Sequence, residues 1–164
     1  MIEFYRNSIT VGSAIEDREG NSGKDGSTNN YLSYGALTAR HFDAWYSCIA
    51  RSGIGLMVSW SSPIMPEIYY RLNPFDKESI WDFSKASPDN VVNLLQNDCA
   101  LMSMPDYDQF KIRFGKTAPT EDFIITSYKK FISLLRKHYP EAHIICSLGS
   151  MEATKPGSPW PGLY

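Results

Sequence analysis

The chain has 164 residues with a net charge of −2, and 43% of its residues are hydrophobic. This length fits a single domain over residues 1–164, large enough to remove roughly 70% of its unfolded surface from water. The near-neutral charge lacks a basic stripe, which argues against nucleic acid or an anionic membrane as a partner. No apolar run approaches the ~20 residues that span a bilayer. Met1 leads straight into a strand-like run without a signal peptide, so the chain as written is expected in the cytoplasm.

Strand-like runs alternate with loops and helix-like segments along the chain. In order, the sequence predicts a strand at 2–5, a helix at 31–42, strands at 45–50 and 91–95, helices near 107–114 and at 120–139, and a strand at 143–148. Three of the strands are nearly continuous apolar runs, as expected for strands covered on both faces. The pattern predicts an α/β fold with a parallel sheet and helices on both of its faces.

The two longer helices carry recognisable ends. Asn29 or Asn30 is expected to cap the first of them, and Thr120 the second, because their side chains can accept from free backbone N–H groups. The 120–139 helix should bury an apolar stripe of Ile124, Tyr128, Phe131 and Leu135.

Metal and disulfide chemistry find little support in the sequence. Three cysteines form an odd count without a Cys-x-x-Cys motif, and the three histidines are scattered. Cys48 and Cys146 lie in strand-like runs, where a small buried side chain is the ordinary interpretation. We expect no metal and no cofactor.

Three turns, here called corners, follow three of the predicted strands. Ser8 comes after the first strand, Gly53 after the second and Asn97 after the third. Each has an ordinary structural explanation: Ser8 could cap a helix, Gly53 could form a turn, and Asn97 could form an Asx-turn. Asp98 is expected to stabilise its loop rather than to act as a base.

The combination is more informative than its parts. In an open parallel sheet, ligands bind outside the carboxyl ends of the strands, near the point where strand order reverses. A serine hydroxyl and two oxyanion donors at that edge are what acyl-ester hydrolysis requires. No Gly-x-Ser-x-Gly motif occurs, so the α/β-hydrolase nucleophile turn is not the template.

Several segments resemble the SGNH (GDSL-like) hydrolases, and most closely their carbohydrate esterase family 2 branch. Asn7-Ser8-Ile9-Thr10 is similar to the first block of that family, Ser52-Gly53-Ile54-Gly55-Leu56 to the second, and the segment from Val91 to Asp98 to the third. Further similar segments are residues 30–40, 81–84, 139–144 and 157–162. The resemblance therefore runs nearly the whole length of the chain.

The resemblance implies a three-layer α/β/α, flavodoxin-like SGNH fold with a parallel sheet. It also implies that Ser8 is the nucleophile, with the Ser8 N–H, the Gly53 N–H and the Asn97 side chain forming the oxyanion hole. The implied reaction removes acetyl groups from carbohydrate hydroxyls through an acyl-serine. Trp160 could pack against a sugar ring, or serve in the core or a lid.

The departures from the family pattern matter as much. Arg6 stands where the family has glycine and could distort the turn or reach over the site. The histidine of the family's last block is expected beyond Tyr164, together with the last strand and helix. The N-terminal β-sandwich of family members is likewise expected to lie outside this sequence, and full-length relatives are expected to be secreted or periplasmic.

These departures shape the expected activity. His41, His138 and His143 all read better as packed or solvated residues than as a base, so this chain is expected to be weak or inactive. An exposed edge strand at 143–148 could pair with another chain and give a homo-oligomer.

Three alternatives stay open. The chain could be a catalytically dead carbohydrate-binding fragment or a truncated product without function of its own. A nucleotide-binding domain is disfavoured because neither a G-x-G-x-x-G motif nor a P-loop is present.

Overall fold

The computed structural model describes residues 1–18, 20, 26–93 and 97–147, and for residues 93, 97, 99 and 100 the backbone only. The strands are β1 (Ile2–Arg6), β2 (Tyr46–Ala50), β3 (Asn90–Asn93) and β4 (His143–Cys146). The α-helices are α1 (Ser8–Val11), α2 (Tyr34–His41), α3 (Met65–Ile68), α4 (Asn97–Met102), α5 (Asp108–Phe114) and α6 (Glu121–His138), and two 3₁₀ turns are η1 (Asn30–Leu32) and η2 (Phe83–Lys85). None of the described helices is long and apolar enough to cross a membrane.

The described strands form one sheet in the order β2-β1-β3-β4, and every neighbouring pair is parallel. The chain moves outward from β1 to β2, then crosses back to place β3 on the other side of β1. This reversal between β1 and β3 is the switch point of a flavodoxin-like sheet. The predicted parallel α/β sheet is therefore confirmed, and each predicted strand is present within two residues of its expected ends.

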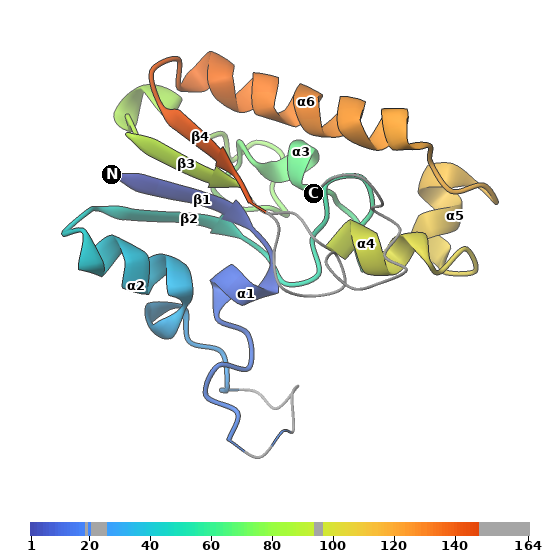
Figure 1. The fold of residues 1–164 in the computed structure, drawn as a ribbon, viewed down its shortest axis with the longest axis horizontal. Helices are drawn as coiled ribbons and strands as arrows, with labels where there is room; N and C mark the ends of the chain where they lie inside the picture. The colour runs from blue at the N-terminus through green and yellow to red at the C-terminus, as the bar shows by residue number, and fades with distance from the viewer. Residues whose placement is uncertain (19, 21–25, 94–96, 148–164) are drawn as a thin grey trace.

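Helices cover both faces of the sheet, which gives three layers (Figure 1). Alternation along β1 sends neighbouring side chains to opposite faces. Phe4 meets Tyr34 of α2 edge-on at 5.9 Å between ring centroids, and Tyr5 meets Phe131 of α6 at 6.0 Å. The larger core cluster lies on the α6 face and includes Tyr5, Tyr69, Val91, Phe131 and Leu135.

Helix α6 follows its sequence pattern closely. Thr120 accepts from the Phe123 N–H, and Ile124, Phe131 and Leu135 are buried while Tyr128 packs against the core cluster. The helix ends at His138, one residue before its predicted end and two residues before Pro140.

The helix predicted at 31–42 is divided in two. Asn29 caps only η1, by accepting from the Tyr31 N–H, and Ser33 then adopts an extended backbone and caps α2 by accepting from Ala36. The expectation of one helix capped by Asn29 or Asn30 is wrong for α2. The physical reason is that Ser33 offers a second cap inside the predicted segment, and its extended conformation interrupts helical hydrogen bonding.

The interpretation of Cys146 as a buried residue is also wrong. It is exposed, whereas Cys48 is half-buried. β4 lies at the end of the described sheet, where its side chains are largely uncovered, and Ile145 is 46% exposed.

Candidate active site

Ser8 is the first residue of α1, directly after the turn that ends β1. The cap of this helix is Asn7, whose buried side chain accepts from the Ile9 N–H, so the interpretation of Ser8 as a cap is wrong. The half-buried Ser8 hydroxyl is thus not committed to capping. Its own N–H lies in the first helical turn, where no intrahelical carbonyl is available, and can be donated to a ligand.

Gly53 lies three residues beyond the last residue of β2. Its φ of +76° favours glycine, and a Cβ at this position would come 3.1 Å from Cβ of Trp60. The Arg51 N–H donates to the Arg6 carbonyl, which extends the pairing of β1 and β2 up to the turns that carry Ser8 and Gly53. These two corners therefore leave the sheet side by side.

Asn97 begins α4, four residues after Asn93 ends β3. Its backbone is described, whereas its side chain lies outside the described structure. Because Tyr5 pairs with Asn93 and Arg6 with Ala50, the three strands end together, and the three corners follow the carboxyl ends of adjacent strands. Figure 1 shows α1 and α4 at this same end of the sheet. Trp160 lies outside the described residues.

Asp98 is fully buried beneath the loop that follows Gly53. Its carboxylate accepts from the backbone N–H groups of Leu56, Met57 and Val58 at 2.7, 2.6 and 2.8 Å. Burial raises the pKa of Asp98 to about 6, while the three donors oppose that shift by favouring the charged form. Asp98 was expected to stabilise its own loop, but it lies in α4 and all three contacts are to the backbone of the loop after Gly53, so the loop that it stabilises is a different one.

Arg6 neither distorts the turn nor extends over the site. It keeps strand geometry opposite Ala50, and its side chain is 3% exposed. The guanidinium lies 5.1 Å from the ring centroid of Tyr34 and donates to Oγ of Ser147 at 2.9 Å. Burial lowers the pKa of Arg6, and the Tyr34 ring face and the Ser147 hydroxyl partly replace its lost hydration.

All three histidines of the chain lie away from Ser8, toward the amino ends of the strands. His41 ends α2 before the loop into β2, His138 ends α6 before the loop into β4, and His143 is the first residue of β4. His138 stacks on Phe83 with ring centroids 3.7 Å apart, and burial lowers its pKa. His138 packs against Phe83, while His41 and His143 are exposed, which agrees with the expectation that these histidines are packed or solvated residues.

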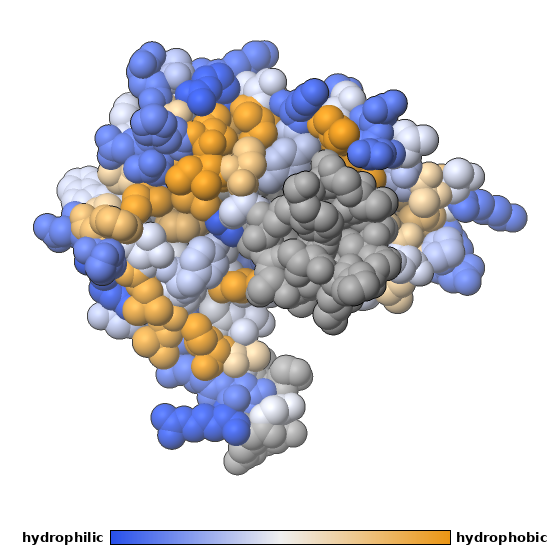
Figure 2. Space-filling model, viewed as in Figure 1, coloured by the Kyte–Doolittle hydropathy of each residue, from blue (hydrophilic) through white to orange (hydrophobic). Residues whose placement is uncertain are grey.

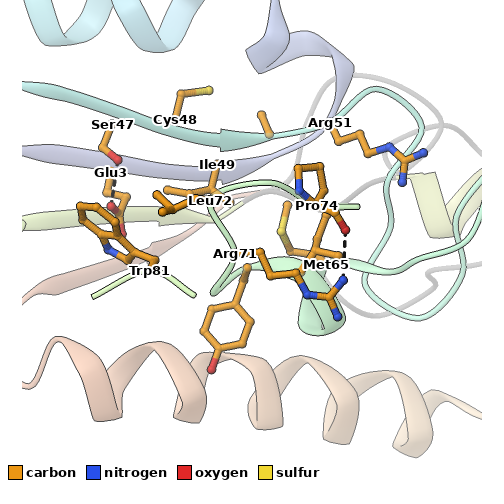
Figure 3. A pocket seen from close by; sticks show the side chains of 13 residues that line it. Glu3, Ser47, Cys48, Ile49, Arg51, Met65, Arg71, Leu72, Pro74 and Trp81 are labelled. Atoms are coloured by element: carbon orange, nitrogen blue, oxygen red, sulfur yellow. Dashed lines mark hydrogen bonds between the residues drawn. The ribbon is translucent and has the colours of Figure 1, made fainter. Parts of the chain in front are cut away.

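A separate groove of about 280 Å³ runs along β2 and is closed by segment 65–81 (Figure 3). At one end, the buried Glu3 accepts from Ser47 beside Trp81, and Arg71 lies further along. Of the candidate residues whose side chains the structure describes, neither Ser8 nor Gly53 lines this groove. Among the residues that the structure describes, no group of three His, Cys, Asp or Glu side chains could hold a metal ion.

Sequence reasoning missed two residues of this edge. Asn7 is the buried cap of α1, and an Asn directly before Ser-Ile-Thr after a strand is a recognisable capping signal. Gly55 lies against Asp98, with an added Cβ 1.9 Å from the Val58 carbonyl oxygen and 2.9 Å from both carboxylate oxygens. The spacing Gly53-x-Gly55 was a signal for such a close backbone approach.

The architecture is that of a flavodoxin-like α/β domain, and the three corners form a candidate site near its switch point. No family model matches the chain. Its sequence is 37% identical to the cellulase/esterase CelE of Acetivibrio thermocellus over 158 residues, which are 92% of this chain and 17% of CelE. It is 25% identical to an acetylxylan esterase/glucomannan deacetylase of Cellvibrio japonicus, over 88% of this chain and 38% of that protein.

A solved structure gives the same result. A family two carbohydrate esterase from Clostridium thermocellum, in complex with cellohexaose, matches with a TM-score of 0.71 and 34% identity, over 92% of this chain and 43% of that one. The resemblance to carbohydrate esterase family 2 is thereby confirmed, and with it the SGNH-type fold class. The chain spans less than half the length of each of these relatives.

Proposed function

We propose that this chain carries the ester-cleaving core of a carbohydrate esterase that removes acetyl groups from sugar hydroxyls. The observation that supports it most is that Ser8, Gly53 and Asn97 follow the carboxyl ends of three adjacent strands. The related proteins are named an esterase and a deacetylase, and one related structure holds cellohexaose. A carbohydrate ester is therefore the proposed substrate class.

In the proposed reaction, the Ser8 oxygen forms a bond to the acetyl carbonyl carbon and loses its proton to a base. The resulting oxyanion accepts from the Ser8 N–H, the Gly53 N–H and the Asn97 amide. Collapse of this intermediate breaks the bond to the sugar oxygen, which leaves with a proton, and water then hydrolyses the acyl-serine. Removing one such donor typically costs about 10²–10³-fold in kcat.

Turnover by this chain should be slow because its three histidines lie toward the amino ends of the strands, whereas Ser8 lies at their carboxyl ends. Without a base the serine hydroxyl keeps a high pKa and is a poor nucleophile. Oxyanion stabilisation and binding alone leave roughly 10³–10⁴-fold catalysis over water when a catalytic triad is disabled.

Hydrolysis of p-nitrophenyl acetate by this chain tests both statements. The expected result is a slow rate that Ser8→Ala removes and that Ser13→Ala, a change at an exposed serine five residues away, leaves intact. An equal rate in the chain and in Ser8→Ala would exclude Ser8 as the nucleophile. Fast turnover that Ser8→Ala abolishes would instead contradict the proposed weakness.

A carbohydrate-binding fragment without catalysis is the second candidate, favoured by the cellohexaose bound to a related structure. A fluorophosphonate probe separates the two functions, because labelling at Ser8 requires a reactive hydroxyl. Binding of cello-oligosaccharides by calorimetry without labelling would support the binding fragment. Labelling that is lost in Ser8→Ala would support the esterase.

We also propose that the chain self-associates through β4. Within the described sheet β4 pairs with β3 alone, so its outer backbone groups are free to pair with a second copy. Beside it, a hydrophobic groove contains Phe4, Phe42, Val92 and Ile145, and Figure 2 shows hydrophobic side chains on this side of the molecule. Sedimentation velocity should detect a dimer that Ile145→Lys weakens. A monomer at high concentration would exclude this proposal.

A further inference from the structure

Residues 53–60 form a closed loop after β2, here called the 53–60 loop. The Trp60 N–H donates to the Gly53 carbonyl at 2.9 Å and closes its base, and the Gly55 N–H donates to Oγ of Ser59 at 2.9 Å. Residues 54–59 are all buried, and Val58 is 0% exposed. The backbone N–H groups of a buried loop need hydrogen-bond acceptors within the protein. Here a side chain from another element accepts from three of them.

That side chain is Asp98, which lies directly after Asn97 in the first turn of α4. One of its carboxylate oxygens accepts from Leu56, and the other accepts from both Met57 and Val58. Gly55 leaves room for this contact, since a Cβ there would lie 2.9 Å from each carboxylate oxygen. The carboxylate thus joins the backbone that carries Gly53 to the backbone that carries Asn97.

We propose that Asp98 is a positioning residue that fixes the separation between the Gly53 turn and the backbone of Asn97 across the switch point. The assignment of a catalytic purpose to this separation rests on the proposed function. The mechanical part does not, because it concerns only how α4 holds the 53–60 loop. Charge-assisted bonds to a fully buried carboxylate are about twice as strong as neutral ones, which suits a rigid link between two loops.

Asp98→Asn is the sharpest variant because it keeps the size of the side chain. Its single carbonyl oxygen can still accept from Met57 and Val58, but its NH₂ group would then face the Leu56 N–H, and two donors would oppose each other. Asp82→Asn is the matched control, since Asp82 is an exposed aspartate that accepts from the N–H and hydroxyl of Ser84 at the start of η2.

Amide hydrogen exchange measures the mechanical part. In Asp98→Asn, exchange should rise at least tenfold at Leu56, Met57 and Val58 and also at Trp60, whose N–H closes the loop on Gly53. Exchange in α6 should stay at the wild-type rate, and Asp82→Asn should leave the loop unchanged. Wild-type exchange at Trp60 in Asp98→Asn would overturn the inference, because the effect would then stop short of Gly53.

Kinetics measure the catalytic part. Ser8-dependent hydrolysis in Asp98→Asn should fall at least tenfold in kcat with KM changed less than twofold, since oxyanion alignment matters more in the transition state than in the bound substrate. Unchanged kcat with a loosened loop would also overturn the positioning role. If the wild type shows no Ser8-dependent hydrolysis, the proposed function fails, and exchange at Trp60 still decides whether Asp98 holds the loop.

Discussion

The two ends of the sheet differ in the residues that they display and in what those residues do. The amino end carries all three histidines, the residue type most often used for proton transfer. The carboxyl end carries a serine, a glycine and an asparagine in turns that also occur in ordinary loops. Judged by residue type alone, the amino end would be the candidate site.

Contacts reverse that judgement. At the amino end, His138 is stacked flat on Phe83, and its Nε2 lies 3.4 Å from the Tyr69 hydroxyl. The imidazole ring is therefore used in packing. At the carboxyl end, Asn7 and Asp98 are buried and bond to backbone N–H groups. Burying a polar group is costly unless it is hydrogen-bonded. The two buried side chains bond to the backbone of these turns and hold it in a fixed conformation. The difference teaches that turn rigidity is a better guide than residue type.

The largest effect is expected from filling the space beside Asp98. In Gly55→Val, Cβ would lie 1.9 Å from the Val58 carbonyl oxygen, closer than any real contact, so the 53–60 loop must move off the carboxylate. We expect a loss of about 4 kcal/mol in the free energy of unfolding, a size typical of substitutions that overpack a core or break a buried hydrogen-bond network. Urea unfolding followed by circular dichroism measures it.

Gly115→Ala is the control for Gly55→Val. Gly115 has a φ of +67°, but an added Cβ there meets nothing within 4 Å. Its ψ of −120° places it outside the left-handed helical region, so only a backbone strain of about 1–3 kcal/mol should appear. Equal losses in the two variants would show that contact with Asp98 is unimportant, and would remove the contrast between the two ends.

The next effect concerns pH and the charge of Asp98. Burial raises its pKa to about 6 from an unfolded value near 3.8, so between those pH values the folded state binds more protons than the unfolded state. A group with this sign costs stability as pH rises from about 4 to 6, by about 2–3 kcal/mol in total at 1.4 kcal/mol per unit. The difference in unfolding free energy between wild type and Asp98→Asn should therefore shift against the wild type over that window.

Taking this difference removes the carboxylates that titrate in both proteins, such as Glu67, whose pKa is lowered by its hydrogen bonds with Arg113. Urea unfolding at pH 4, 5, 6 and 7 measures the shift. A difference that stays flat from pH 4 to 7 would mean that the three N–H donors fully offset burial and that Asp98 stays charged throughout.

The sequence could predict the sheet and the corners because both depend on local signals. Apolar runs, three of them nearly continuous, located the four strands, and the turns after the first three runs located Ser8, Gly53 and Asn97. It could not predict that Ser33 would interrupt the first long helix, because Asn29 and Ser33 are both competent caps and only packing selects their roles. The prediction that Cys146 is buried was wrong for a related reason, because the burial of a strand depends on whether it lies in the middle or at the edge of the sheet.

Long-range polar contacts were the other limit. Asp98 lies 42 residues from Leu56 and Arg6 lies 141 residues from Ser147, and no pattern within either segment encodes those pairings. The sequence therefore predicted that Asp98 stabilises its own loop, whereas its carboxylate bonds to the backbone of residues 56–58. The sequence suggested that Arg6 could distort the turn, but its guanidinium instead lies over the Tyr34 ring. Only the fold creates this contact.

The smallest effect tests the amino end. His138→Ala removes the ring stacked on Phe83, a contact worth about 1 kcal/mol beyond burial, and should lower the unfolding free energy by about 1–2 kcal/mol. Any Ser8-dependent hydrolysis should remain, because His138 and Ser8 lie at opposite ends of the strands. His41→Ala, at an exposed helix end, is the control and should change stability by less than 0.5 kcal/mol. If hydrolysis fell with His138→Ala while stability held, this histidine would act in the chemistry and the division between the two ends would be wrong.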